Sequence, residues 1–197
     1  AFLSNESFNK KTIKELIEYF NNIKPVDNYF SESFGNKFFS YEASKKIGTI
    51  REEIEKLSDT LTLREKYILI TSLIYSFDKV ANTCGHYDAY RNNTSMSDNF
   101  IMKELNIYHN NNSNNIILNG DANEIIKEVG EVDILYLDPP YNPRQYISAY
   151  HLIENVAKWE KPEVEGKASK MVDRKKYNST YCSRTAIESY EELVNNA

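Results

Sequence analysis

The chain has 197 residues, 41% hydrophobic and 27% charged, which is enough apolar material for one core. No apolar run approaches the roughly 20 residues of a bilayer span, and no basic segment followed by an apolar one marks a signal peptide, so we expect no membrane association. The net charge of −5 disfavours non-specific nucleic-acid binding by the whole surface, although a local basic face remains compatible with it.

Two cysteines, Cys84 and Cys182, are too few for a disulfide framework and favour a reduced, cytoplasmic setting. The cysteines and the three histidines show neither C-x-x-C nor H-x-x-x-H spacing, so we expect no bound metal. The chain begins with Ala1 rather than Met, which fits processing, a cloning boundary or a fragment of a longer protein.

The first 83 residues have a helical pattern. Apolar residues recur at helical spacing over 13–20 and 43–57, and Ser40 fits the N-cap of the second stretch. Thr62-Leu63-Arg64-Glu65 is a capping box that opens a third helix. This helix is apolar on nearly all sides as far as Phe77, which predicts a buried central position.

Residues 84–115 are rich in Asn and show no clear period. Such a stretch is most often a loop or linker, but loops on a rigid scaffold also carry recognition. Both interpretations stay open, and in the second His86, Tyr87 and Tyr90 are candidate DNA contacts.

From residue 116 the pattern becomes strand, helix, strand. The apolar run 116–118 leads into the turn Asn119-Gly120-Asp121, where Asp121 fits the N-cap of a helix, and a strand-like run follows at 132–137. Such short turns predict a parallel α/β sheet covered by helices. Two more helices are expected, around 150–157 and from Ser183, as a cap, through residue 194.

A locally basic stretch lies between these last two helices and at the start of the second. It is either a solvated loop or a surface that contacts phosphates, and the sequence favours neither. Its residues are Lys167, Lys170, Arg174, Lys175, Lys176 and Arg184.

The second predicted strand ends in Asp138-Pro139-Pro140-Tyr141. In open α/β sheets, ligands bind beyond the carboxyl ends of the strands. Two prolines alone can end a strand and begin a turn, but that role explains neither the Asp before them nor the Tyr after them. The sequence therefore predicts an active site at this tetrapeptide.

The four residues suit the methylation of an exocyclic adenine amine, whose lone pair is delocalised into the ring. The Asp138 carboxylate and the Pro139 carbonyl can accept hydrogen bonds from the two amino hydrogens, which frees the lone pair. The proline rings, including that of Pro140, hold the direction of this carbonyl. Tyr141 offers a ring face to a base that is flipped out of the duplex.

The run from Tyr136 to Tyr141 resembles the catalytic motif of amino-methyltransferases that act on DNA. Its extension, Asn142-Pro143-Arg144-Gln145-Tyr146 followed by Tyr150-His151, is similar to bacterial adenine-specific (N6) DNA methyltransferases of the DNA adenine methylase type, which are commonly paired with restriction enzymes. The likeness covers most of the chain, with weaker matches at 28–30, 35–36, 78–82, 119–122 and 181–182.

The resemblance implies a Rossmann-like α/β methyltransferase sheet, here incomplete, with a mainly helical subdomain. It divides the chain into a helical part (1–83), a loop-rich target-recognition region (84–115) and the catalytic half of the sheet (116–197). It further implies S-adenosylmethionine as methyl donor, double-stranded DNA as substrate and a cognate restriction endonuclease as a partner.

The resemblance also implies roles for single residues. Asp138 to Tyr141 would form the catalytic set, with Asp138 also near the methyl donor. Asp121 would approach the adenine of S-adenosylmethionine, or it is a plain helix cap. Tyr146, with Tyr150, would join Tyr141 around the substrate base, or both pack in the core, as aromatic residues at this spacing more often do.

One part of the family pattern is missing. The family has a Phe-x-Gly-x-Gly loop after its first strand, and no two of the six glycines here are close enough to form one. We therefore expect a chain truncated at both ends, in which these residues alone bind the cofactor poorly.

Two other functions stay open. One is an amino-methyltransferase that acts on cytosine N4, RNA adenine or a glutamine side chain, although Asp rather than Asn at position 138 argues weakly against glutamine. The other is an inactive DNA- or partner-binding fragment, which the missing glycine loop favours. Binding of S-adenosylmethionine separates an intact enzyme from such a fragment.

Overall fold

The computed structural model describes residues 6–107, 115–140 and 142–197, and these are mainly helical. The α-helices are α1 (Lys10–Asn22), α2 (Tyr29–Phe34), α3 (Tyr41–Lys56), α4 (Leu63–Asp78), α5 (Ala122–Ile125), α6 (Tyr146–Lys158) and α7 (Ala186–Asn196). Short 3₁₀ helices are η1 (Ser58–Thr60), η2 (Ile126–Glu128), η3 (Arg174–Tyr177) and η4 (Thr180–Cys182), and two strands are β1 (Val164–Glu165) and β2 (Lys170–Met171).

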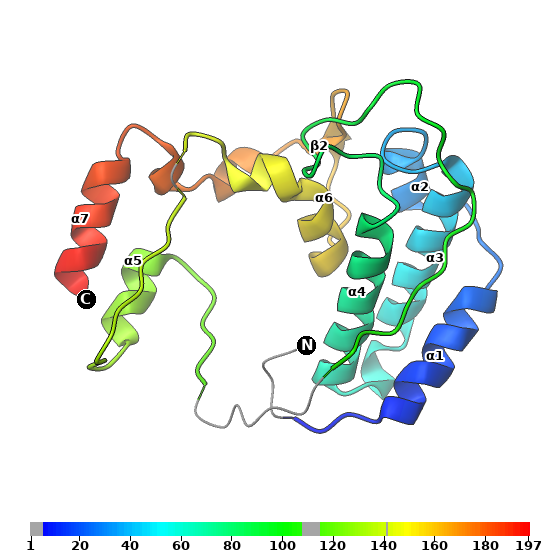
Figure 1. Ribbon diagram of the computed structural model, residues 1–197, viewed down its shortest axis with the longest axis horizontal. Helices are drawn as coiled ribbons and strands as arrows, with labels where there is room; N and C mark the ends of the chain where they lie inside the picture. The colour runs from blue at the N-terminus through cyan, green and yellow to red at the C-terminus, as the bar shows by residue number, and fades with distance from the viewer. Residues whose placement is uncertain (1–5, 108–114, 141) are drawn as a thin grey trace.

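The helices form two groups (Figure 1). In the larger group α3 packs against α2 and α4, α1 packs against α4, and α6 lies on α4. In the smaller group α7 packs against α5, η2 and η4, at the opposite side of the view. The segment between α5 and α6, which carries the predicted catalytic motif, therefore connects the two groups.

Local capping signals set where the first helices begin. The Ser40 hydroxyl accepts a hydrogen bond from the Ala43 amide at 3.2 Å, so the predicted cap of α3 is confirmed. The predicted capping box of α4 is also confirmed, since Thr62 Oγ1 accepts from the Glu65 amide at 3.2 Å and Glu65 Oε2 accepts from the Thr62 amide at 2.9 Å. The other Glu65 oxygen accepts from the amide of Asn9, the N-cap of α1, so one carboxylate joins two helix starts.

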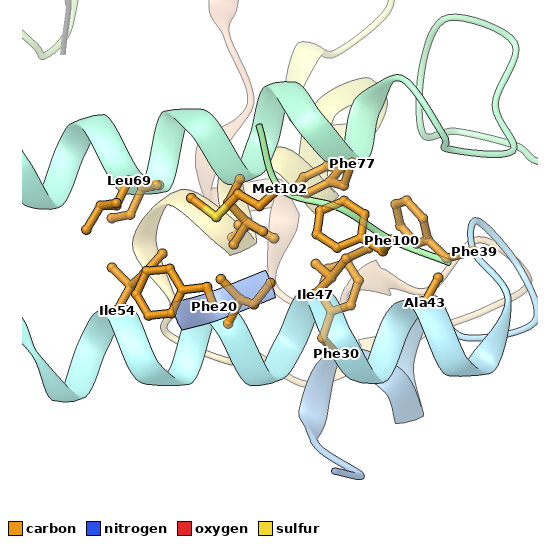
Figure 2. Close-up of a cluster of buried hydrophobic side chains, with 14 of the residues drawn as sticks. Phe20, Phe30, Phe39, Ala43, Ile47, Ile54, Leu69, Phe77, Phe100 and Met102 are labelled. Atoms are coloured by element: carbon orange, nitrogen blue, oxygen red, sulfur yellow. The ribbon is translucent and has the colours of Figure 1, made fainter. Parts of the chain in front are cut away.

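The core lies between α1, α2, α3, α4 and α6. Figure 2 shows side chains of α3 and α4, including Ile47 and Phe77, meeting between the two helices. Phe100 and Met102, from the chain after α4, are 5% and 1% exposed in the same core. The prediction of a buried central helix is confirmed for the inner face of α4, while Tyr67 on its outer face is 48% exposed.

Tyr87 links α6 to α4 through hydrogen bonds. Its amide donates to the Ala149 carbonyl at 2.7 Å, its carbonyl accepts from His151 Nε2 at 2.9 Å, and its hydroxyl donates to Asp78 at 2.8 Å. The helix is kinked beside these contacts, at Tyr150 (φ −121°, ψ 15°). Tyr87 is only 2% exposed, so its predicted role as a DNA contact is wrong: its ring is needed in the core.

Arg51 holds the other end of α6. This side chain is 1% exposed, and its Nε donates to the Val156 carbonyl at 2.8 Å, in the last turn of the helix. Its charge is balanced by Glu55 at 2.8 Å, and its guanidinium lies 5.1 Å from the centre of the Trp159 ring. A cation at a helix C-terminus satisfies carbonyls that have no partner within the helix.

The predicted parallel strands are not paired in the structure. Residues 116–118 and 132–137 belong to no sheet, and in the described part of the chain the one sheet is the antiparallel pair β1–β2, with Val164 opposite Met171. Ile116 and Ile134 are 83% and 86% exposed. A strand needs neighbours that take its backbone hydrogen bonds and cover its side chains, and the described residues supply neither here.

The last helix begins later than predicted. Ser183 is not its cap, because the Ser183 hydroxyl accepts from the Thr185 amide before the helix starts at Ala186. Leu193 is buried on the inner face of α7, whereas Ile187 is 71% exposed. Across the described ranges, none of the helices has both the length and the apolar character that a membrane crossing requires.

The Gly48→Ala substitution is expected to destabilise the chain by about 2 kcal/mol, although Gly to Ala inside a helix normally stabilises by about 1 kcal/mol. A Cβ at Gly48 would lie 1.9 Å from Asn28 Oδ1. That oxygen cannot move away without breaking hydrogen bonds, because it accepts from the Phe30 and Ser31 amides and so caps α2. Urea denaturation measures the effect. Gly130→Ala, where nothing lies within 4 Å, is the control, and a stabilised Gly48→Ala variant would contradict the packing.

Acid is expected to destabilise the core through His151, which is fully buried. Burial lowers the pKa of His151 to about 4, opposed by the hydrogen bond to Tyr87, while Lys170 and Arg174 lower it further and Asp88 raises it. The unfolded chain binds this proton more readily. Stability is therefore full above pH 6.5 and falls by roughly 3 kcal/mol as the pH drops towards 4.

Denaturation curves between pH 7 and pH 4 check this, with His151→Gln as the test variant. The glutamine keeps a donor for the Tyr87 carbonyl but does not titrate, so the variant is expected to lose less stability on acidification. His86→Gln, at a half-exposed position, is the matched control. Equal pH dependence of the wild type and His151→Gln would show that His151 does not titrate as stated.

Candidate functional site

The predicted catalytic motif lies in extended chain between the two helix groups. Asp138 is exposed, and Pro139 and Pro140 are half-buried. The fourth member, Tyr141, lies outside the described residues. The motif therefore presents its carboxylate to solvent on a backbone that the two proline rings stiffen.

One groove brings Asp138 together with Asp121. It has a volume of about 780 Å³ and is lined by residues 119–122, 136–140 and 176–181, with Leu193. We call it the acidic groove. Lys176 lies on its wall but is paired with Asp173, so its charge is already partly balanced. The two carboxylates predicted to face the cofactor thus share one cavity, although the strands that were expected to position them are unpaired.

A second groove lies beside the same prolines. It has a volume of about 610 Å³ and is lined by residues 139–140, 142–143, 181–183 and 186–187, with Leu137, Tyr190 and Glu191. We call it the apolar groove, because prolines, aliphatic groups and tyrosine rings supply most of its wall. Leu137, Pro139, Pro140 and Tyr181 line both grooves.

Asp121 is a helix cap as predicted. Its Oδ1 accepts a hydrogen bond from the Asn123 amide at 2.9 Å, at the start of α5. The residue is exposed and lines the acidic groove. A cap uses one acceptor of the four that a carboxylate has, so the cap and a cofactor contact are compatible.

Tyr146 and Tyr150 are not core residues. They are 49% and 45% exposed, and their rings meet edge to face with centroids 5.9 Å apart. The alternative in which both rings pack inside is therefore wrong. Neither ring lines either groove, so a role for Tyr146 at the substrate base stays a prediction.

Most of the basic stretch is already paired. Arg174 lies 2.9 Å from Glu165, Lys170 pairs with Asp88, and Lys167 lies over the Tyr90 ring. Surface pairs of this kind contribute little to stability, but they reduce the free positive charge available to phosphates. The structure therefore supports the solvated interpretation for these residues more than a continuous basic face.

Sequence reasoning missed three side chains that organise the site. Gln145 reaches from the start of α6 to the 179–182 segment, and Asn123 and Tyr181 bind each other between α5 and η4. Burial raises the pKa of Tyr181, and the charges of Asp121 and Glu192 raise it further. Gln145 and Tyr181 do lie in stretches that resemble the family, at 142–146 and 181–182, but the resemblance gave neither residue a role.

No group of three or more metal-ligating side chains gathers in the part of the chain that the structure describes. The acceptors at the site are carboxylates, carbonyls and amides on a mostly apolar wall, a set suited to hydrogen bonding with a planar organic ligand. A groove of this kind beside an Asp-Pro-Pro motif is compatible with the class that the motif resembles, the amino-methyltransferases.

Comparison with known proteins identifies the family. Residues 4–196 match the family model of the D12 class N6 adenine-specific DNA methyltransferases, and the chain belongs to this family. No solved structure matches the chain at a significant level. The family implies a Rossmann-like α/β fold and S-adenosylmethionine as methyl donor.

Three relatives illustrate the similarity. The chain is 36% identical over 165 residues to modification methylase StsI of Streptococcus sanguinis, covering 81% of this chain and 25% of that protein. It is 34% identical over 168 residues to type II methyltransferase M.NlaIII of Neisseria lactamica (82% and 48%). It is 32% identical over 167 residues to type II methyltransferase M.FokI of Planomicrobium okeanokoites (81% and 25%). The chain thus spans a quarter to a half of the length of these relatives.

Proposed function

We propose that the protein transfers a methyl group from S-adenosylmethionine to N6 of adenine in a specific sequence of double-stranded DNA. The observation that carries the proposal is the shared groove: Asp138, Pro139 and Asp121 line one cavity in a chain of this family. The relatives are named modification methylase and type II methyltransferase, which supports a place in a restriction-modification system with a cognate endonuclease. The proposed site of action is the cytoplasm, where bacterial DNA lies.

Asp138 and Pro139 prepare the target amine. The Asp138 carboxylate accepts a hydrogen bond from one amino hydrogen and the Pro139 carbonyl accepts one from the other. An amine nitrogen that donates both of its hydrogens in this way becomes tetrahedral. Its lone pair is then no longer delocalised into the adenine ring and is available to the methyl donor. The prolines keep the carbonyl aimed before the substrate arrives, so no reorganisation is needed during reaction.

Asp121 and Asp138 fit the polar part of the cofactor. S-adenosylmethionine supplies an electrophilic methyl group on a positively charged sulfur. Two carboxylates in one groove favour a cationic ligand, and the free acceptors of Asp121 suit an exocyclic amine of the cofactor's adenine. The proton released from the amine on methylation passes to solvent or to Asp138, which is exposed.

The target base has to leave the duplex to reach this site. Tyr141, next to Pro140, is proposed to stack on the flipped base, and Tyr146 offers a half-exposed ring at the start of α6. The chemistry of an exposed aromatic pair near the motif supports a role in holding the base or the neighbouring nucleotides.

The fold proposal is a Rossmann-like sheet to which residues 116–118 and 132–137 contribute strands. Exposed apolar side chains support it, because Ile134 and Tyr136 are 86% and 80% exposed, and a strand that lacks its neighbours leaves such side chains uncovered. Along the chain we propose three parts: a helical part (1–83), a target-recognition region (84–115) and the catalytic half of the sheet (116–197).

The Asp138→Ala substitution is expected to reduce methyl transfer at least about 100-fold in an active polypeptide that contains these residues, because one acceptor for the amine is lost. Since Asp138 is exposed, its loss leaves the fold intact. Transfer of labelled methyl groups to DNA is the measurement. Asp133→Ala, an exposed carboxylate on the same segment, is the matched control, and near wild-type turnover in Asp138→Ala would rule out the mechanism.

The 197-residue chain by itself is expected to bind S-adenosylmethionine no more tightly than about 0.1 mM and to be inactive. Ligand sites bury roughly 70–90% of such a molecule. Here Asp121 and Asp138 are exposed in an open groove, and the sequence contains no Phe-x-Gly-x-Gly loop. Joining a segment with such a loop is expected to restore binding and activity.

Calorimetry on the isolated chain makes this measurement. Micromolar one-to-one binding would show that these residues already form a complete cofactor site. If a loop-bearing polypeptide binds DNA but neither binds S-adenosylmethionine nor transfers methyl groups, the competing function of an inactive DNA-binding fragment replaces the one proposed.

A further inference from the structure

Gln145 stands at the junction between the catalytic motif and α6. It is the N-cap residue of this helix, but its side chain makes no cap hydrogen bond with the helix. It is turned instead towards residues 179–182, more than thirty positions further along the chain. The only glutamine in the protein therefore makes a long-range contact.

The carboxamide pairs with the backbone of Ser179 in both directions. Gln145 Oε1 accepts from the Ser179 amide at 2.8 Å, and Nε2 donates to the Ser179 carbonyl at 3.1 Å. Nε2 also lies 3.4 Å from the Cys182 carbonyl. A side-chain amide that both donates to and accepts from the backbone of one residue has the hydrogen-bond pattern of a residue pair in an antiparallel β-sheet. The two bonds fix the relative orientation of the two groups as well as their distance.

The held segment contributes one residue to the wall that the two grooves share. Tyr181, inside this segment, lines both the acidic and the apolar groove, and so do Pro139 and Pro140. A shift of Tyr181 relative to the prolines therefore changes the lining of both grooves. Gln145, at the start of α6, hydrogen-bonds to the segment that carries Tyr181.

A second residue holds Tyr181 from the opposite side. The Tyr181 hydroxyl donates to the side-chain oxygen of Asn123, which is 8% exposed. The Asn123 amide then donates to the Ser189 carbonyl at 3.0 Å and to Glu192 at 2.8 Å, both on α7. The segment that Gln145 holds is thus also linked, through Tyr181 and Asn123, to α7.

We infer that Gln145 is a positioning residue for methyl transfer, acting through the backbone of Ser179 to hold Tyr181 at a set distance from the Asp-Pro-Pro backbone. This inference rests on the proposed function for its catalytic part. Gln145 lines neither groove, so it acts through Tyr181 to keep the base and the methyl donor in place across the shared wall. A displacement of about 1 Å at such a wall is enough to lower a rate about 100-fold.

The first test uses the chain itself, with Cys84→Ser so that Cys182 is the only thiol. Cys182 is 5% exposed and lies in the held segment, so its labelling by Ellman's reagent reports opening of that segment. Gln145→Met keeps the volume and removes the hydrogen bonds. Labelling is expected to become about 10- to 100-fold faster in this variant, well below the unfolding temperature.

Two variants serve as comparisons for the labelling rate. Arg144→Met changes the neighbouring, exposed side chain and is expected to leave the rate within about twofold. Gln145→Glu keeps the acceptor for the Ser179 amide but loses the donor for both carbonyls, so it is expected to label faster than the parent. An unchanged rate in Gln145→Met would overturn the inference.

The second test is kinetic, in an active polypeptide that contains residues 1–197. Gln145→Met and Gln145→Glu are expected to lower kcat per folded molecule about tenfold or more, with KM for S-adenosylmethionine within about threefold of the wild type. Faster Cys182 labelling with unchanged kcat would make Gln145 a stabilising residue only, and the inference would fall. A wild type that transfers no methyl group refutes the proposed function instead, whatever the labelling rates.

Discussion

The hydrogen bonds of Tyr87 are the interaction on which the position of the site depends. They join a segment without helix or strand to α4 through Asp78 and to α6 through Ala149 and His151. The kink at Tyr150 lies between the two α6 partners, so the helix is bent where Tyr87 inserts. Because α6 begins shortly after the predicted catalytic motif, the contacts of Tyr87 fix the position of the helix to which the motif connects.

Sequence predicted the parts of the fold whose causes are local. The Ser40 cap and the Thr62–Glu65 box were readable because donor and acceptor lie within three residues of each other. The role of Tyr87 was not readable, because its partners on α6 lie more than sixty positions away. An aromatic residue in an Asn-rich stretch has the same local pattern whether it contacts a ligand or fills a core.

The site was predictable at its centre and not at its edges. The Asp-Pro-Pro motif is rare by composition, and the turn before α5 marks Asp121, so both acids of the groove were found from sequence. The predicted strands did not form a sheet. An apolar run indicates a possible strand, but a strand also needs hydrogen bonds from the backbone of a neighbouring strand. Gln145 and Tyr181 lie in stretches that resemble the family, but their roles were not readable, because their contacts join segments far apart in the sequence.

Exposure of Asp138 limits what the motif does before its substrates bind. In water, an amine already has acceptors for both hydrogens, so a solvated carboxylate offers it little advantage. The acceptor pair becomes effective only when water is excluded, since a carboxylate and a carbonyl then act in a low dielectric. The described residues leave the groove open on the side of Asp138. Under the proposed function, the target base itself has to cover Asp138 and exclude water from it, so that recognition of the base and activation of its amine arise from the same event.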